Sequence, residues 1–354
     1  QHFIDSLIPK YGQAFHTEKP NINQFDYVAC NLWPALIITY QIKTVLYRYT
    51  NTSPTDWNGI PSNEKDRIQN LLNQPNNLIW PIQIACAQKL ATFFILDKKF
   101  ARECIMPLFH DESTRHQTWA AFLAFPRITS SFSEEDVSNL LEDQIAEARN
   151  LCEYKDQGLR NNYWDVLFNF MNMQSNTSNT YDAVLKTVLY NSGFSTLSEI
   201  AKFLPYWCRQ QNDEQIDIAW KNWLKTYITN RFQGIPRDLD SEEQKALICL
   251  VPSLRGHISE ALEILSTTDN TSIDFSQDHY PVPEGYDEKE QQQLLLFYQW
   301  KVKHQTGECD STLLRWWLHR ILRNLTDEYP DLDLTALRET MQDQFGFTGI
   351  AGID

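Results

Sequence analysis

Residues 212–265, NDEQIDIAWKNWLKTYITNRFQGIPRDLDSEEQKALICLVPSLRGHISEALEIL, decide the fold that we expect for this chain. Within them, Ile216, Trp220, Trp223 and Tyr227 recur at intervals of three or four residues. This interval places the four side chains on one face of an α-helix, and an apolar face predicts a helix that packs against a neighbour. The polar residues between them then face water.

Cap and turn residues divide this stretch further. Asn212 has the position of an N-cap for the first helix, and Gly234 and Pro236 end that helix. Asp240 then caps a short second helix, and Ser253 precedes a third. The stretch therefore predicts a helical hairpin with a further short helix behind it.

The composition of the whole chain favours a folded helical protein. Of the 354 residues, 42% are hydrophobic and 13% aromatic, and 11 are Trp, so the chain can bury a large core. Glycine is scarce at 11 residues, which leaves few turns of the kind that hairpin-rich sheets need. We therefore expect helices rather than strands.

Apolar patterns with the helical period continue through most of the chain, joined by short polar linkers. They predict an all-α fold in which antiparallel helices form an array like a HEAT-repeat α-solenoid. We expect four parts: a helical array over 1–265, an acidic, proline-containing connector over 266–290, C-terminal helices over 291–345 and a flexible tail over 346–354. A partner surface is the alternative for the connector, and a docking peptide is the alternative for the tail.

Prolines and caps mark the expected starts of several helices. Phe25–Tyr49 has the pattern of one long helix, either continuous or kinked at Pro34. Trp80 and Pro81 begin the next long pattern. Ser133, with an aspartate three residues on, has the spacing of a capping box at the start of another helix.

Two segments far apart in the chain resemble each other. Trp57–Pro61 reads WNGIP and Phe232–Pro236 reads FQGIP, and each follows a helix pattern with Lys, Leu and Tyr at matching intervals. In both segments a glycine would stop one helix and a proline would begin the turn to the next. A duplication predicts stacked repeat units, whereas coincidence is the alternative because the spacing before the two segments differs.

The charge and the cysteines limit the partners and the compartment. A formal net charge of -15 opposes binding to nucleic acids and to anionic membranes, so we expect neither as a partner. The 7 cysteines have no C-x-x-C spacing, which is typical of reduced thiols. No apolar run is long enough to span a membrane and no signal peptide is evident, so we expect a cytoplasmic protein.

The densest group of residues with metal-binding or acid-base potential is His110, Asp111, Glu112, Arg115 and His116. The two histidines are six residues apart, which places them on different faces of a helix, whereas helical zinc sites use a spacing of four. The two carboxylates precede an apolar helix, where they would serve as caps and dipole partners. We therefore predict no metal site here, and the sequence leaves open whether the cluster has a chemical role.

Packing is the plainer interpretation of the remaining candidates. His319 and Arg320 follow Trp316, which indicates a cation near an aromatic surface. Cys208 and Cys249 lie on apolar helix faces, where a thiol is a small core residue rather than a nucleophile. The chain also lacks a glycine-rich phosphate loop, G-x-S-x-G and G-x-G-x-x-G. We predict no catalytic, cofactor-binding or metal-binding residue, and no cofactor.

A longer pattern resembles a known family. It consists of Pro107, Leu108, Phe109, Trp119, Phe122 and Leu123, followed later by Trp220, Trp223, Leu224, Tyr227, Arg231, Gly234, Pro236, Glu242 and Glu243. Over about residues 80–265 the chain is similar to the helical region that follows sirtuin-like domains in bacterial anti-phage defence proteins. The resemblance implies an all-helical module that accompanies an NAD-consuming effector. It carries over no catalytic residue, because the dinucleotide glycines and a catalytic histidine in a sirtuin-like setting do not occur.

Two functions from different classes follow. The first is a non-catalytic helical scaffold or sensor that binds a protein partner or a fused N-terminal effector domain; the start at Gln1 rather than Met is typical of a piece of a longer protein. The alternative is an enzyme or ligand-binding protein with a small-molecule site in a cavity between helices. A closed cavity with converging titratable groups would favour the alternative, and an open groove would favour the scaffold.

Overall fold

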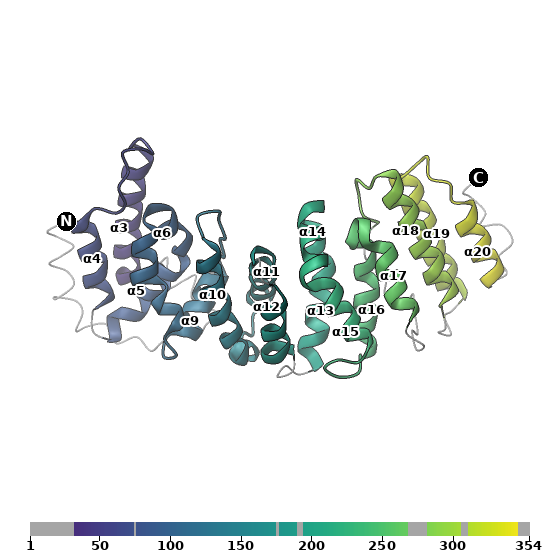
Figure 1. Cartoon of the computed structure of the whole chain (residues 1–354), viewed down its shortest axis with the longest axis horizontal. Coiled ribbons are helices and arrows are strands. Elements are labelled where there is room, and N and C mark those ends of the chain that lie inside the picture. The colour runs from purple at the N-terminus through teal and green to yellow at the C-terminus, as the bar shows by residue number, and fades with distance from the viewer. Residues whose placement is uncertain are drawn as a thin grey trace. The chain divides into compact units, whose positions relative to one another are not determined.

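The structure of the chain is a computed structural model, shown in Figure 1. It describes residues 32–73, 76–174, 177–189, 194–267, 282–305 and 311–345. These residues are almost entirely helical and include no β-strand, so the predicted all-α fold is confirmed. Contacts divide the chain into two compact units: unit 1, Gln1–Asn176, and unit 2, Thr177–Asp354. The predicted boundaries after residues 265 and 290 stay predictions.

The helices of unit 1 pack mainly on near neighbours in the chain. In order they are α3 (Trp33–Thr50), α4 (Ser62–Leu72), α5 (Asn76–Gln88), α6 (Leu90–Leu96), α7 (Lys98–Phe100), η3 (Ala101–Ile105), α8 (Pro107–His110), α9 (Arg115–Ala124), α10 (Glu134–Glu147), η4 (Ala148–Glu153) and α11 (Gln157–Met173). α5 packs against α3 and α9, and α11 packs against α9 and α10 (Figure 1). Buried aromatic rings join α8 to α9: Phe109, Trp119 and Phe122 meet edge to face.

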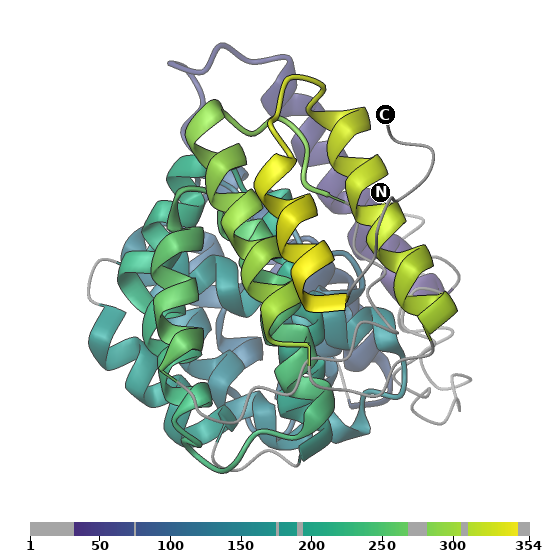
Figure 2. The ribbon, with the colours of Figure 1, turned by 90° about the vertical axis from the view of Figure 1, so that its right-hand side faces the viewer.

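Unit 2 follows the same local pattern of packing. Its helices are α12 (Thr177–Val184), η5 (Leu185–Leu189), α13 (Phe194–Gln210), α14 (Asp213–Ala219), η6 (Trp220–Leu224), α15 (Lys225–Phe232), α16 (Ser241–Leu250), η7 (Val251–His257), α17 (Ile258–Ser266), α18 (Glu288–Lys303), α19 (Ser311–Glu328) and α20 (Thr335–Phe345). α13 packs on α16, and α17 contacts α15 and α18. In the end-on view of Figure 2, α18 and α20 lie side by side and α19 is the outermost of the C-terminal helices.

The helix starts that depend on capping residues are confirmed. Asn212 caps α14 in a complete capping box: its side chain accepts a hydrogen bond from the Gln215 amide, and the Gln215 side chain accepts one from the Asn212 amide. Ser133 begins α10 in the same way, and the carboxylate of Asp240 accepts a hydrogen bond from the Glu243 amide at the start of α16. The predicted apolar face is also correct, since Trp220 and Trp223 are both buried.

Two predicted helix starts, those at Ser253 and at Pro81, are wrong. Ser253 does not precede α17 but lies inside the 3-10 helix η7, and His257 is the residue before α17. Pro34 lies in the first turn of α3, where its missing N–H costs nothing, so it causes no kink. Pro81 lies inside α5, which begins five residues earlier at Asn76. The part of the predicted Phe25–Tyr49 helix before residue 32 lies outside the described residues.

The two G-I-P segments share a backbone feature. Gly59 has φ +90 and Gly234 has φ +75, a region that favours glycine. Gly234 comes soon after the end of α15 at Phe232, but α3 already ends at Thr50, so the expectation that Gly59 stops a helix is wrong. Different groups hold the two turns: the Asp97 carboxylate accepts a hydrogen bond from the amide of Ile60, whereas the Arg231 guanidinium donates to the carbonyl of Ile235. The shared glycine geometry therefore serves two differently built turns.

The end of the predicted connector is packed rather than slack. Val282 and Pro283 are buried, and the Tyr329 hydroxyl donates to the carbonyl of Pro283. The Tyr286 hydroxyl likewise donates to the carbonyl of Pro252 in η7. Residues 268–281 of the connector and the tail 346–354 lie outside the described residues.

Candidate functional site on helix α19

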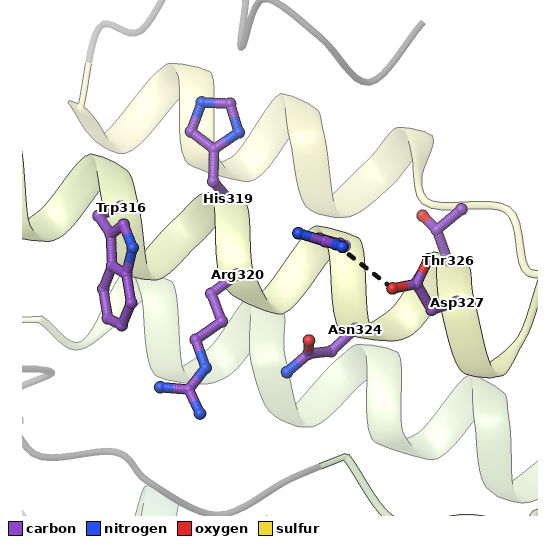
Figure 3. Close-up of a pocket in the computed structure, with 7 residues that line it drawn as sticks. Trp316, His319, Arg320, Asn324, Thr326 and Asp327 are labelled. Atoms are coloured by element: carbon purple, nitrogen blue, oxygen red, sulfur yellow. Dashed lines mark ion pairs between the residues drawn. The ribbon is translucent and has the colours of Figure 1, made fainter.

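One face of α19 carries a row of polar and aromatic side chains. The row lines an open groove of about 820 Å³, shown in Figure 3: Trp316, His319, Arg320, Arg323, Asn324, Thr326 and Asp327. Trp316, Arg320, Arg323 and Asp327 follow one another at intervals of four, three and four residues, which is why a single helix presents them together. Among the described residues, α19 alone lines this groove.

The opposite face of α19 fixes this orientation. Leu318, Leu322 and Leu325 are fully buried, and Trp317 is only 4% exposed. Trp316, its neighbour in the chain, is 58% exposed. The apolar face of α19 packs in the core of unit 2. The ring of Trp316 therefore lies in contact with solvent, whereas large aromatic side chains are usually buried.

Trp316 and Arg320 form a stacked pair one helical turn apart. The guanidinium carbon of Arg320 lies 5.4 Å from the centroid of the indole ring, within the range of a cation–π contact. The described residues provide no hydrogen-bond or ion-pair partner for this guanidinium, so its five N–H donors remain available to a ligand. The sequence indicates a cation beside an aromatic ring, and in the structure the Trp316 ring is exposed while Arg320 is half-buried.

The other charged groups of the row are arranged around this pair. Arg323 forms an exposed ion pair with Asp327 at 3.5 Å. In Figure 3, Arg320 and Trp316 extend toward the same side of α19, whereas His319 extends from the opposite side. The lining thus contains two arginines, one histidine and one aspartate. Such a surface suits a carboxylate-bearing ligand with a flat apolar group, and it contains no nucleophile beside a base.

The structure separates the two histidines that formed the densest sequence cluster. His110 Nδ1 lies 2.6 Å from Asp143 Oδ2, and His116 Nδ1 contacts Glu147 Oε1. The two carboxylates are one turn apart on α10, so each histidine has its own partner. No group of three or more histidines, cysteines and carboxylates that could hold a metal occurs in the described part of the chain.

His116 joins α9 to the end of α10 and to η4. Its ring stacks on Tyr154 at a centroid distance of 5.1 Å, and its Nε2 lies 3.1 Å from Glu153 Oε2. The Tyr154 hydroxyl donates to the fully buried carboxylate of Glu147 at 3.0 Å, and burial raises the pKa of Tyr154 well above its ordinary value. Apart from His116 Nε2, which has no hydrogen bond of good geometry, these groups satisfy one another, which is typical of a structural cluster.

Asp111 and Arg115, two further members of the predicted cluster, have structural roles. Asp111 accepts hydrogen bonds from the backbone and hydroxyl of Ser113, which lower the pKa of its carboxyl. It holds the turn before α9 and does not cap that helix, because Thr114 occupies the N-cap position. Arg115 donates to the carbonyl of His110. The expectation that Asp111 would be a helix cap is corrected to a turn-forming role.

Buried thiols offer no nucleophile. Cys208 is fully buried, and burial raises the pKa of its thiol, so the thiolate is disfavoured. Cys86 is equally buried with the same direction of shift. Cys249 is half-buried.

Comparisons with known proteins add no relatives: no family model, no curated protein and no solved structure matches the chain. None of the helices among the described residues is long and apolar enough to cross a membrane.

Proposed function

We propose that this chain is a non-catalytic helical scaffold that binds an acidic segment of a partner protein along α19. The observation that carries the proposal is the exposed Trp316 ring with the Arg320 guanidinium stacked on it, where no described residue occupies the guanidinium donors. Trp and Arg are the residue types that most often dominate the free energy of binding at protein interfaces. In this chain the Trp316 ring is exposed and Arg320 is stacked on it.

Charge determines which partner this surface suits. The groove residues carry more positive than negative charge, although the whole chain has a formal net charge of -15. An acidic segment would gain local ion pairs with Arg320 and Arg323 but would be repelled at longer range. We therefore expect selective binding with a modest association rate, since long-range attraction is what accelerates encounter.

The arrangement of the helices supports a scaffold. Within each unit most helix contacts join elements close in the chain, as α13 with α16 or α17 with α18. Repeat proteins of the α-solenoid type have this local contact pattern, and we propose a HEAT-like array on this basis. The open groove on α19, lined by one helix, also fits the scaffold better than an enzyme that would enclose its substrate.

The cellular setting is part of the same proposal. The cysteines in the described part of the chain are free thiols, which suits the cytoplasm. The similarity to the helical region of sirtuin-like defence proteins suggests an NAD-consuming effector as the partner. A loss of NAD during phage challenge that requires residues 1–354 would support this setting, and an effector that is triggered equally without them would contradict it.

The binding proposal is tested by fluorescence anisotropy with the full chain. The probe is a fluorescein-labelled peptide of alternating Glu and Phe residues, and the same peptide with Lys in place of Glu is the comparison. We expect the acidic peptide to bind more tightly, and Trp316→Ala and Arg320→Gln each to weaken binding by about tenfold.

Arg338→Gln is the matched control, because Arg338 is an exposed arginine on the neighbouring α20. It should leave binding unchanged. Equal affinity for the two peptides, or equal effects of the three substitutions, would contradict the proposal. Self-association of the chain that Trp316→Ala abolishes, measured by sedimentation, would identify a second copy as the occupant instead.

A further inference from the structure

A second pocket of unit 2 lies where α13, η7 and the segment before α18 meet. Its volume is about 230 Å³, and its lining residues are Arg209, Ser253, Arg255, Val282, Pro283, Glu284 and Tyr286. These residues come from positions up to 77 apart in the chain, so the fold and not a local motif assembles the pocket. It shares no residue with the groove on α19.

The backbone at Arg255 is strained. Arg255 has φ 50 and ψ -123, and it is the one residue other than glycine with positive φ in the described part of the chain. Glycine would adopt this conformation freely, and the chain has a glycine at the next position, Gly256. Strained non-glycine residues cluster where a side chain is needed in a particular place.

The side chain of Arg255 is held in that place from two sides. Its Nη1 lies 2.6 Å from Asp213 Oδ1, and its guanidinium carbon lies 5.6 Å from the ring centroid of Tyr286. The Tyr286 hydroxyl is itself anchored on the carbonyl of Pro252. No other described residue accepts a hydrogen bond from the Arg255 guanidinium, so its remaining N–H groups are available.

A second guanidinium faces the same pocket. Arg209 Nε donates to the hydroxyl of Ser253 at 3.3 Å, and Ser253 is 2% exposed. The pocket is therefore lined by two guanidinium groups and a buried hydroxyl. The carboxylates nearby are Asp213, which is engaged by Arg255, Glu284, which is exposed, and Glu290, which interacts electrostatically with Arg255. Arginine pairs of this kind match the geometry of phosphate and carboxylate oxygens.

We propose that this pocket binds a small oxyanion between Arg209 and Arg255, as a free anion or as the phosphate or carboxylate group of a small metabolite. Its volume is below that of pockets for drug-sized ligands, about 300–1,000 Å³, so the bound group is small. The bound oxyanion would lie against η7, between α13 and the end of the connector. The proposal is independent of partner binding on α19.

The test is calorimetric titration of the full chain with sodium phosphate, with sodium sulfate and sodium acetate in separate arms and sodium chloride at matched ionic strength as the reference. We expect phosphate to bind with a stoichiometry of one and to raise the melting temperature above that in chloride. Arg209→Gln and Arg255→Gly should each weaken binding by about tenfold or more, because each removes charge-assisted hydrogen bonds.

Arg255→Gly removes the guanidinium while supplying the residue that its backbone conformation favours, so loss of binding is separable from loss of fold. Arg338→Gln on α20 is the matched control and should bind as the unchanged chain does. If Arg255→Gly does not fold, Arg209→Gln and Ser253→Ala carry the test. Tighter binding of acetate than of phosphate would assign the site to carboxylates and support the proposal. The proposal is overturned if no oxyanion is preferred over chloride, or if the arginine variants bind like the control.

Discussion

Trp223 and Trp316 show how differently one residue type is used in unit 2. Trp223 is 2% exposed and its ring lies 5.7 Å from that of Trp207, whereas Trp316 is 58% exposed. We expect Trp223→Ala to lower the free energy of unfolding by roughly 3–5 kcal/mol through lost transfer energy and a residual cavity. Trp316→Ala should change it by less than about 0.5 kcal/mol. Urea denaturation measures both, and comparable losses for the two variants would contradict the assignment of Trp316 to the surface.

Glu260 predicts a dependence of stability on acid pH. The hydrogen bond from Lys225, helped by those from Trp220 and His257, lowers the pKa of Glu260 from 4.5 to about 2. A lowered carboxyl pKa stabilises the fold above the unfolded value of 4.5, and this contribution is lost as the pH falls toward 2. The difference in melting temperature between the unchanged chain and Glu260→Gln should therefore be largest at neutral pH and should decrease below pH 4.5.

Glu263 provides the control for this prediction, because it is an exposed glutamate one turn along the same helix. Glu263→Gln should give a small difference in melting temperature with little change over the same acid range. Since Glu260 is 43% exposed, solvent screens its interactions and the effect should be modest. A difference for Glu260→Gln that grows as the pH falls would have the wrong sign and refute the linkage.

At the residue scale the sequence predicts some neighbours and misses others. Trp316 and Arg320 are one helical turn apart, so their contact could be predicted from the sequence. The contacts of His116 with Glu147 and of Arg255 with Asp213 join residues 31 and 42 positions apart, and only the packing of helices decides them. The positive φ of Arg255 had no signal in the sequence, because the neighbouring Gly256 is the residue that a turn would be expected to use.

At the scale of the element, the helices that begin with capping residues are the most predictable, as the boxes at Asn212 and Ser133 show. Caps are local hydrogen bonds, so three or four residues determine them. The π-helical turn at Trp220–Leu224 was not predicted, because it keeps the apolar residues at nearly the helical interval. Pro81 misled the prediction of α5, since the packing of that helix tolerates a proline in its interior.

The two G-I-P turns allow a paired test. An added Cβ at Gly59 would lie 2.5 Å from Asp97 Oδ2, and one at Gly234 would lie 2.9 Å from Asp238 Oδ1, with φ positive at both. We expect Gly59→Ala and Gly234→Ala each to cost about 1–3 kcal/mol of stability. Gly256→Ala is the control, because its Cβ would meet nothing within 4 Å. Denaturation curves that show three equal effects would mean that the turns do not require glycine.

The turn after α15 also depends on a buried ion pair. Arg231 and Glu243 are both 0% exposed, and Arg231 Nε lies 2.6 Å from Glu243 Oε1. Glu243→Ala would leave the guanidinium buried without its charge partner, so we expect a loss of about 3–5 kcal/mol. Glu242→Ala removes the adjacent glutamate from an exposed pair with Lys202 and should cost less than about 1 kcal/mol. Urea denaturation measures both variants. Similar losses of stability for Glu243→Ala and Glu242→Ala would contradict the expected difference between the buried and the exposed ion pair.

At the scale of the whole molecule, the sequence predicted the fold class but not the division of the chain. Helical periodicity and scarce glycine were enough for an all-α fold, since both are properties of short windows or of composition. No sequence pattern marks the boundary between the two units near residue 176, because this boundary depends on which helices pack together. The same reason explains why the pocket of Arg209, Ser253 and Arg255 could not be predicted.

Each unit should fold without the other. Unit 2, Thr177–Asp354, has its own buried core, including Trp207, Leu247 and Leu318, and its own buried ion pair between Arg231 and Glu243. A chain of this size can bury enough apolar surface to fold alone. We expect the fragment 177–354 to give a helical circular dichroism spectrum and a cooperative thermal transition. The fragment 213–354, which removes α13 and with it the main neighbour of α16, is the control and should lose that transition. If 177–354 melts without cooperativity while the full chain melts sharply, the two units share one folding core and the division at residue 176 is not a folding boundary.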